Sequence, residues 1–251
     1  MGMLHNRCFY LALFFLLLLA GAGKAQVGEY RSVLSVGING GVAMSSMDFD
    51  PTIKQQLHIG PTVGVTVRYT CEKYFTTVCA MQAELNISQM GWKENVLSSE
   101  GEELEDEYER DLWYIQLPLL ARLSWGREER GAMFFILLGP QVGYYLSGSE
   151  TFGSTWTLDA DGNPDRPNSV YQQYGKEPER KLDYGLVGGG GLEINTSIGH
   201  FMLEGRYYYG LGDMYGNSKK DPFGRSAHTS IIVKITYLFD LFNHNKQSAG
   251  T

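Results

Sequence analysis

Apolar and polar residues alternate along most of the chain beyond residue 32, and a period of two is the pattern of a β-strand with two different faces. In the segment 59–69, for example, Val63 and Val65 share one face while Thr66 and Arg68 share the other. Seven more segments alternate in the same way: 33–47, 81–88, 116–124, 134–147, 184–194, 201–209 and 228–239. Most of them are near or above the roughly 9–11 residues with which a tilted strand crosses a bilayer. We therefore expect about eight strands.

The connections between these segments differ in length. Three are short, at 71–75, 125–131 and 195–199, and four are long and polar, at 48–58, 91–111, 148–182 and 212–225. Short turns at one end and long loops at the other are typical of an up-and-down barrel in an outer membrane. No Pro/Ser-rich linker or long internal repeat divides the chain, so we predict a single domain.

The charged residues of the alternating segments fall on one face. These residues are Arg68, Glu84, Arg122, Glu193, Glu204, Arg206 and Lys234. The opposite face has no charge and carries aromatic residues toward its ends: Tyr69, Trp125, Phe134, Tyr144, Tyr207, Tyr237 and Phe239. A soluble barrel or sandwich, the alternative, normally carries Lys and Glu interspersed on every strand of its outer face. The pattern thus favours an apolar face toward lipid, and it predicts an all-β fold: a single eight-stranded antiparallel up-and-down transmembrane β-barrel in the outer membrane.

The N-terminal segment has the features of a secretory signal peptide. A basic start is followed by an apolar run at 8–22, and Gly23 and Ala25 place small residues before a cleavage site after Ala25. The run is shorter than the roughly 20 residues of a transmembrane helix. We therefore divide the chain into a signal peptide at 1–25, a barrel domain at 26–240 and a short C-terminal tail at 241–251.

Composition and charge exclude several classes of protein. The chain has 251 residues with 21 Lys and Arg against 28 Asp and Glu, so the basic balance of a nucleic-acid-binding protein is missing. Cleavage would remove Arg7 and Lys24, which leaves 19 basic residues against 28 acidic ones and a net charge of -9. The most apolar later stretch, 132–146, contains Gly139 and Pro140, which argue against a membrane helix.

Two cysteines remain after cleavage, Cys71 and Cys79, and they flank a predicted short turn. An oxidising compartment permits a disulfide between them. Seven intervening residues do not by themselves set the Cα separation that a disulfide requires, so a bridge and two free thiols both remain open.

The seven charged residues of the strands are expected to face the barrel interior. The lumen of an eight-stranded barrel is just wide enough for side chains to fill it. Four basic and three acidic groups are nearly balanced, and buried charges persist when they are paired. We therefore expect a plug of salt bridges and hydrogen bonds in the lumen, with a gated ion path as the alternative.

Catalytic and cation-binding chemistry has only weak signals. Ser226 and His228 lie two residues apart with Asp213 in the preceding loop, but no nucleophile motif surrounds them, so a polar rim histidine is expected. An acidic segment at 98–111 either is a solvated loop or attracts cations. A candidate cation-binding loop has oxygen ligands at alternate positions: Asp159, Asp161, Asn163 and Asp165. It departs from the EF-hand pattern at Pro164 and Val170, so we expect no catalytic residue, resident metal or cofactor.

Three pairs of short strings in the chain resemble the PorT-type family of outer-membrane β-barrel proteins. The first pair is YIQLPLLAR at 114–122 and LGPQVGY at 138–144. The second is YG at 184–185 and GGGGLE at 188–193, and the third is EGRY at 204–207 and GL at 210–211. The resemblance implies an eight-stranded barrel and an accessory role in protein secretion, because the best-known member assists export through the type IX pathway. The expected partners are outer-membrane lipid and other envelope or secretion proteins, with no nucleic acid. The alternative is a surface binding or adhesion barrel acting through the segment 148–182 and the acidic segment.

Overall fold

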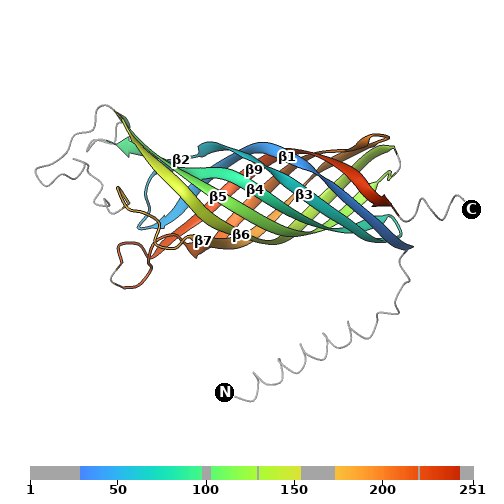
Figure 1. Cartoon of the computed structure of the whole chain (residues 1–251). Coiled ribbons are helices and arrows are strands. Elements are labelled where there is room, and N and C mark those ends of the chain that lie inside the picture. The colour runs from blue at the N-terminus through green and yellow to red at the C-terminus, as the bar shows by residue number, and fades with distance from the viewer. Residues whose placement is uncertain (1–28, 98–102, 129, 154–172, 220, 244–251) are drawn as a thin grey trace, which may run out of the picture.

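The described part of the chain contains nine β-strands, and eight of them close into a barrel (Figure 1). The computed structural model describes residues 29–97, 103–128, 130–153, 173–219 and 221–243. The strands are β1 (Glu29–Asp50), β2 (Gln55–Gln56), β3 (His58–Tyr74), β4 (Thr77–Leu97), β5 (Glu103–Gly126), β6 (Gly131–Phe152), β7 (Leu182–Thr196), β8 (Gly199–Asp213) and β9 (Arg225–Asn243). Each of the eight predicted strands is present.

The barrel has the simplest antiparallel connectivity. Along the ring, β1 pairs with β3, each later strand pairs with the next, and β9 pairs back onto β1. The two residues of β2 pair with Lys93 and Glu94 of β4, beyond the point where pairing between β3 and β4 begins. Closure satisfies the backbone hydrogen bonds of every strand in the ring, which a sheet in lipid requires. The predicted eight-stranded up-and-down barrel is confirmed.

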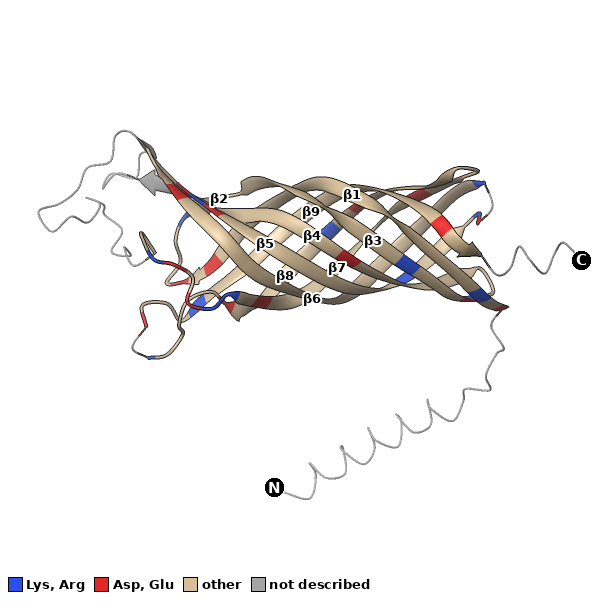
Figure 2. Ribbon diagram, viewed as in Figure 1, with Lys and Arg blue, Asp and Glu red and all other residues tan. Residues whose placement is uncertain are grey.

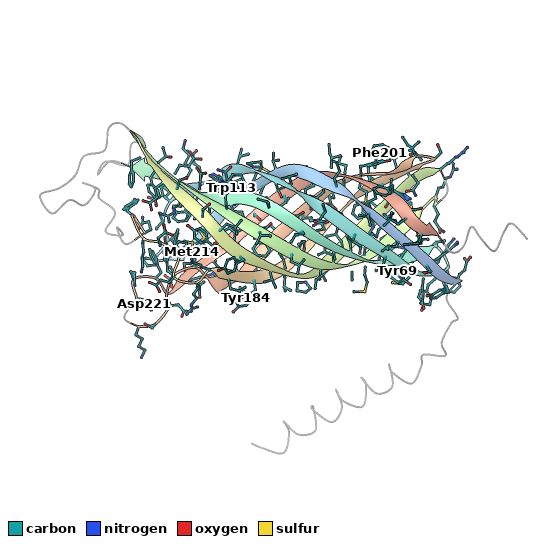
Figure 3. All side chains as sticks on the ribbon, viewed as in Figure 1. Tyr69, Trp113, Tyr184, Phe201, Met214 and Asp221 are labelled. Carbon is teal, nitrogen blue, oxygen red and sulfur yellow. The ribbon has the colours of Figure 1, made fainter. Side chains whose placement is uncertain are left out.

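The outer face of the barrel is apolar. Exposed positions alternate with buried ones along the strands, as in β6 and β8, and the exposed side chains are chiefly Leu, Ile, Val and aromatic residues. Aromatic rings gather toward both ends of this belt: Figure 3 labels Tyr69 and Phe201 near one end, and Trp113 and Tyr184 near the other. Aromatic girdles of this kind flank the lipid-facing band of outer-membrane barrels.

The strands are longer than the sequence pattern predicts. β5 has 24 residues and spans about 60 Å along the barrel axis, at about 3.3 Å per residue and a tilt of about 40°, whereas a lipid-facing band is about 25 Å tall. The prediction of a loop at 91–111 is wrong over most of this segment, because β4 continues to Leu97 and β5 begins at Glu103. Backbone pairing continues through this acidic stretch because it contains no Gly or Pro after residue 101 to end a strand.

The turn between β3 and β4 does not hold a disulfide. Cys71 and Cys79 are free thiols in the structure. The register between β3 and β4 shifts between Thr70 and Glu72, so Glu72, and not Cys71, is the partner of Cys79. The alternative of two free thiols is therefore the one that the structure shows.

The start of β1 and the end of β9 lie side by side at the short-turn end of the barrel, where Val33 pairs with Asn243. The predicted signal peptide and most of the predicted tail lie outside the described residues. β9 continues to Asn243, past the expected end of the barrel domain at 240, because Phe242 and Asn243 extend its pairing with β1 to Leu34 and Val33. Within the described part of the chain, no helix has the length and apolarity needed to span a membrane.

Glycine is required at one inward position of β7. A Cβ atom on Gly191 would lie 2.8 Å from Cζ of Phe135 and would collide with the carbonyl oxygen of Leu203. The Phe135 ring is fully buried in the lumen, so it has little room to move. This close approach explains why a glycine stands at position 191 in the middle of a strand.

We expect Gly191→Ala to lower the free energy of unfolding by about 1–3 kcal/mol, the usual cost of overpacking. Gly205 on the adjacent strand β8 is the matched control, because a Cβ there meets nothing within 4 Å. Urea unfolding of both variants in lipid vesicles measures the difference. Equal stability of the two variants would contradict the packing account.

Candidate functional site

Two ion-pair clusters lie inside the barrel, and the first is centred on Glu84. The Glu84 carboxylate accepts hydrogen bonds from Arg206 at 2.5 and 3.0 Å and from Lys234 Nζ at 2.5 Å. Gln82 and Asn86, its neighbours on β4, also donate to it, at 2.7 and 3.0 Å. Glu204 lies beside the same two cations, 2.8 Å from Arg206 and 3.6 Å from Lys234. Two acids and two bases thus form a neutral group, which we call the Glu84 cluster.

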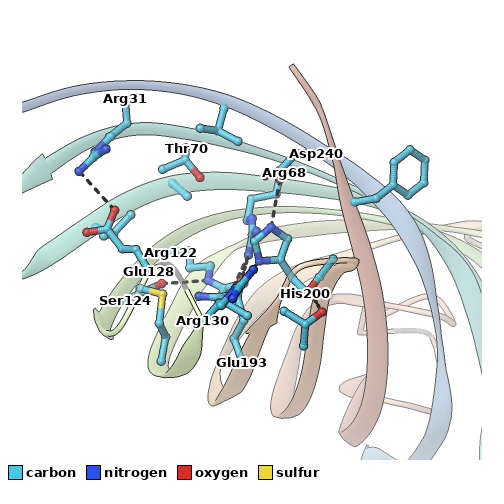
Figure 4. Close-up of a pocket in the computed structure, with 18 of the residues that line it drawn as sticks. Arg31, Arg68, Thr70, Arg122, Ser124, Glu128, Arg130, Glu193, His200 and Asp240 are labelled. Carbon is cyan, nitrogen blue, oxygen red and sulfur yellow. Dashed lines mark hydrogen bonds and ion pairs between the residues drawn. The ribbon is translucent and has the colours of Figure 1, made fainter. Parts of the chain in front are cut away.

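The second cluster is centred on Glu193 and lies nearer the short turns. Arg68 Nη1 is 2.8 Å from both carboxylate oxygens of Glu193, and Arg122 also forms an ion pair with this carboxylate. The Arg122 guanidinium lies 3.8 Å from the centre of the Phe135 ring. His200 contacts Glu193 through Nδ1 at 3.0 Å and Asp240 through Nε2 at 3.1 Å (Figure 4). We call these residues the Glu193 cluster.

The structure places all seven predicted interior charges in these two clusters and buries each of them. It also adds two groups that the sequence analysis missed, His200 and Asp240. Asp240 supplies the acid that the four basic and three acidic predicted residues lacked. Both missed residues have the inward parity of their strands, so extending the alternation toward the strand ends would have found them. Figure 2 shows that charges along the middle of the barrel are confined to a few positions.

A cavity of about 740 Å³ opens between the Glu193 cluster and the short turns. Its wall includes Arg68, Arg122 and Glu193 on the inner side and Arg31 and Glu128 nearer the end of the barrel (Figure 4). Arg130, in the β5–β6 turn, also lines it and has no ion-pair partner within the described residues. In outer-membrane barrels the short turns face the periplasm, so the cavity opens to that side.

A third layer of polar side chains lies nearer the loops. The Tyr114 hydroxyl is 3.0 Å from Nε2 of the buried His228, and the Tyr208 hydroxyl donates to Asp183 at 2.7 Å. His228 therefore lies within the lumen, and the expectation of a histidine at the polar rim is wrong.

The possible Ser226 and His228 pair is not assembled for catalysis. The Ser226 hydroxyl accepts the N–H of Tyr215 at 2.9 Å, and the Asp213 carboxylate accepts the N–H of Ser226 at 2.8 Å. Asp213 thus holds backbone and does not orient the imidazole, which contacts Tyr114 instead. This arrangement lacks the contacts between nucleophile, base and orienting acid on which nucleophilic catalysis depends.

Aromatic side chains close the lumen at the loop end. Phe49 contacts Trp92 and Phe223 with ring centres 5.3 and 5.0 Å apart, and Tyr108 contacts Tyr174 at 4.6 Å. Tyr215 stacks on Phe223 at 5.4 Å. Except for the partly buried Tyr174, these rings are at most 3% exposed. We call this group the aromatic cap; sequence analysis missed it because its members come from strand ends and loops that no periodicity connects.

Hydrogen bonds to carboxylates tie the segment 173–179 across the aromatic cap. Glu94 accepts hydrogen bonds from Gln173 at 3.0 Å and from the Tyr174 hydroxyl at 2.5 Å. Glu150 accepts from the N–H of Gly175 at 3.0 Å and pairs with Arg110. Farther along the segment, the hydrogen bond from Lys176 lowers the pKa of Glu179, which also accepts the N–H of Gly216. The segment therefore seals the loop end of the lumen.

Two predicted cation-binding segments remain, the loop at 159–165 and the acidic segment at 98–111. The proposed cation-binding loop, Asp159, Asp161, Asn163 and Asp165, lies outside the described residues. The last part of the acidic segment is in β5, where Arg110 is buried and pairs with Glu150, so this part is not a solvated loop.

Comparisons with known proteins give a family and several similar solved structures. A family model described as the outer membrane protein beta-barrel domain matches residues 24–216. Among solved structures, Ail, the attachment invasion locus protein of Yersinia pestis, is 15% identical over 84% of this chain and 99% of its own, with a TM-score of 0.35. OprG of Pseudomonas aeruginosa is 12% identical over 84% and 98%, and Neisserial surface protein A is 11% identical over 82% and 97%, both with a TM-score of 0.37. No curated protein matches the sequence.

Proposed function

The chain belongs to the family of outer membrane protein β-barrel domains, and on that premise we propose that it is a non-conducting, non-enzymatic anchor whose loop end binds partners at the cell surface. It is an outer-membrane protein, and its apolar belt contacts lipid. The proposal concerns what such a barrel does beyond residing in the membrane.

The closed lumen is the observation that carries the proposal. The Glu84 cluster fills the middle of the barrel with side chains that are at most 4% exposed, and the aromatic cap covers the loop end. An ion that crossed this lumen would have to break several buried ion pairs, each of which is stabilised by the low dielectric of the interior. The interior charges therefore support a structural plug better than a gated ion path.

The loop end is the part of the protein best placed to bind a partner. Strands β4, β5 and β6 extend well beyond the length that lipid requires, and the longest connection, between β6 and β7, leaves the barrel at this end. Surface loops held by a rigid scaffold are common binding elements. The segment 173–179 fixes one side of that connection to the cap.

We expect the wild-type protein to produce no stable current steps in planar lipid bilayers, because the buried, ion-paired side chains of the Glu84 cluster fill the middle of the barrel. The measurement uses refolded protein at high salt, with a general porin inserted under the same conditions as the positive control. Reproducible single-channel currents from the wild type would contradict the closed lumen and would revive the gated ion path.

An accessory role in protein secretion is the second candidate. The observation that favours it is the cavity at the short-turn end, the end that faces the periplasm in outer-membrane barrels, with Arg130 in its wall and no ion-pair partner for this arginine among the described residues. The resemblance of the strands to PorT-type barrels supports the same role. An envelope protein with an acidic segment would fit this end of the barrel.

One pair of variants separates the two candidates. The first replaces residues 154–172 with a short Gly/Ser linker, and the second is Arg130→Glu at the cavity mouth. Each is expressed in a deletion strain and assayed for adhesion to surfaces coated with extracellular-matrix protein and for the proteins exported to the medium. Loss of adhesion in the first variant alone supports surface binding, whereas loss of exported proteins in the second variant alone supports the secretion role and contradicts the leading proposal.

A further inference from the structure

A histidine and two carboxylates meet near the loop end of the barrel, outside the two ion-pair clusters. They are His58 at the start of β3 and Glu109 and Asp111 on β5, and one donor atom from each lies within 4.8 Å of the others. We propose that these three residues bind a divalent transition-metal ion of the zinc class. The proposal requires only the fold and is independent of what the loops bind.

The donor atoms are close to the spacing that zinc requires. His58 Nε2 lies 3.5 Å from Oε1 of Glu109 and 2.6 Å from Oδ1 of Asp111. Ligands of a tetrahedral zinc ion at about 2.0–2.1 Å are about 3.3–3.4 Å apart. The first separation already fits, and the second must open by about 0.7 Å when the metal ion replaces the hydrogen bond between the two groups.

The backbone explains how residues from two non-adjacent strands come together. β4 lies between β3 and β5, and its residue opposite Asp111 is Gly91, which has no side chain to separate the donors. The Ser45 hydroxyl fixes this glycine by accepting its N–H at 2.9 Å and donating to its carbonyl oxygen at 3.1 Å. Glu109 and Asp111 are two residues apart on one strand, so their side chains leave the same face.

The exposure of the three side chains suits metal binding. The His58 side chain is 2% exposed and its Nδ1 has no hydrogen-bond partner in the described part of the chain, so the ring contacts polar groups only through Nε2. The carboxylates of Glu109 and Asp111 are 39% and 24% exposed, which gives an ion access from solvent. Three protein ligands leave a fourth position for water.

The donor chemistry selects among cations. Calcium and magnesium prefer sites made of oxygen atoms, whereas an imidazole nitrogen favours zinc and its neighbours in the transition series. The sequence just before Glu109, 100–108, has six acidic residues and no basic one. Such a run of negative charge raises the local concentration of cations. The electric field of this acidic run attracts all cations alike, so selectivity for zinc over calcium or magnesium must come from the imidazole of His58.

The test is titration of ZnCl2 into the refolded full barrel, followed by isothermal calorimetry, with wild type compared with His58→Gln, Asp111→Asn and Glu109→Gln. We expect one zinc ion per wild-type barrel and binding weakened at least about tenfold in His58→Gln and Asp111→Asn. Glu29→Gln at the opposite end is the matched control, and it should bind as the wild type does. Heat modifiability, the faster gel migration of unboiled than of boiled protein, shows that each variant has folded.

A second readout excludes unspecific attraction to the acidic run. Binding of Co²⁺ to the wild type should give visible absorption bands of a nitrogen- and oxygen-ligated site, and millimolar Ca²⁺ or Mg²⁺ should leave them unchanged. Zinc binding that is equal in wild type and His58→Gln, or that excess calcium abolishes, would overturn the proposal. Absence of any zinc heat in the folded wild type would overturn it as well.

Discussion

Glu84→Gln is expected to lower the free energy of unfolding by about 3–5 kcal/mol, because it removes the charge that Arg206 and Lys234 share. Both cations are buried, with side chains 2% and 1% exposed, and glutamine keeps the size of the side chain but not its charge. Only Glu204 would then remain to compensate two cations. Urea unfolding in lipid vesicles, followed by tryptophan fluorescence, measures the change.

Two further variants serve as comparisons for the loss of stability in Glu84→Gln. Glu204→Gln should cost less than Glu84→Gln, since Glu204 has a close contact with Arg206 alone and no hydrogen bonds from Gln82 or Asn86. Glu29→Gln changes a side chain that is 63% exposed, and it should have almost no effect. None of the three should create conductance. If Glu84→Gln and Glu29→Gln unfold at the same urea concentration, the Glu84 cluster does not stabilise the barrel.

Leu119→Arg is expected to lower the free energy of unfolding in lipid by about 2–4 kcal/mol, the cost of an arginine at the bilayer midplane of a β-barrel. Leu119 is 49% exposed and lies on β5 midway between Trp113 and Trp125, which belong to the two aromatic girdles. The same unfolding experiment in vesicles measures the effect.

The matched control places arginine at the edge of the belt. Leu241 is also 49% exposed, but it lies near the end of β9, where an arginine side chain reaches water. Leu241→Arg should cost less than about 1 kcal/mol. Equal destabilisation by the two arginines would show that Leu119 does not face the hydrocarbon layer.

The strands and their orientation could be predicted from sequence because each is governed by a local rule. A period of two assigns alternate residues to opposite faces, and seven charges on one parity distinguish the lumen from the lipid face. The structure accordingly buries Arg68, Glu84 and Lys234 and exposes Val63, Leu119 and Ile235.

The strand ends and the loop end could not be predicted in this way. Where strands leave the membrane, water accepts charge on the outer face as well, so Glu109 and Asp111 carry no signal that separates strand from loop. The aromatic cap and the cluster of His58, Glu109 and Asp111 depend on contacts between segments far apart in the chain. Examples are the contacts of Phe49 with Phe223 and of His58 with Asp111. Such contacts follow from the register of the closed ring, which no single segment specifies.

Heat modifiability tests the central claim, an apolar belt that faces lipid around a filled lumen, most directly. Protein refolded in detergent is run on a gel with and without boiling, beside a circular dichroism spectrum. A compact, faster-migrating, β-rich species that needs detergent and is lost on boiling is the predicted result. A β-rich protein that stays soluble without detergent would contradict the account, because the charged face would then be an outer surface and the apolar face an interior.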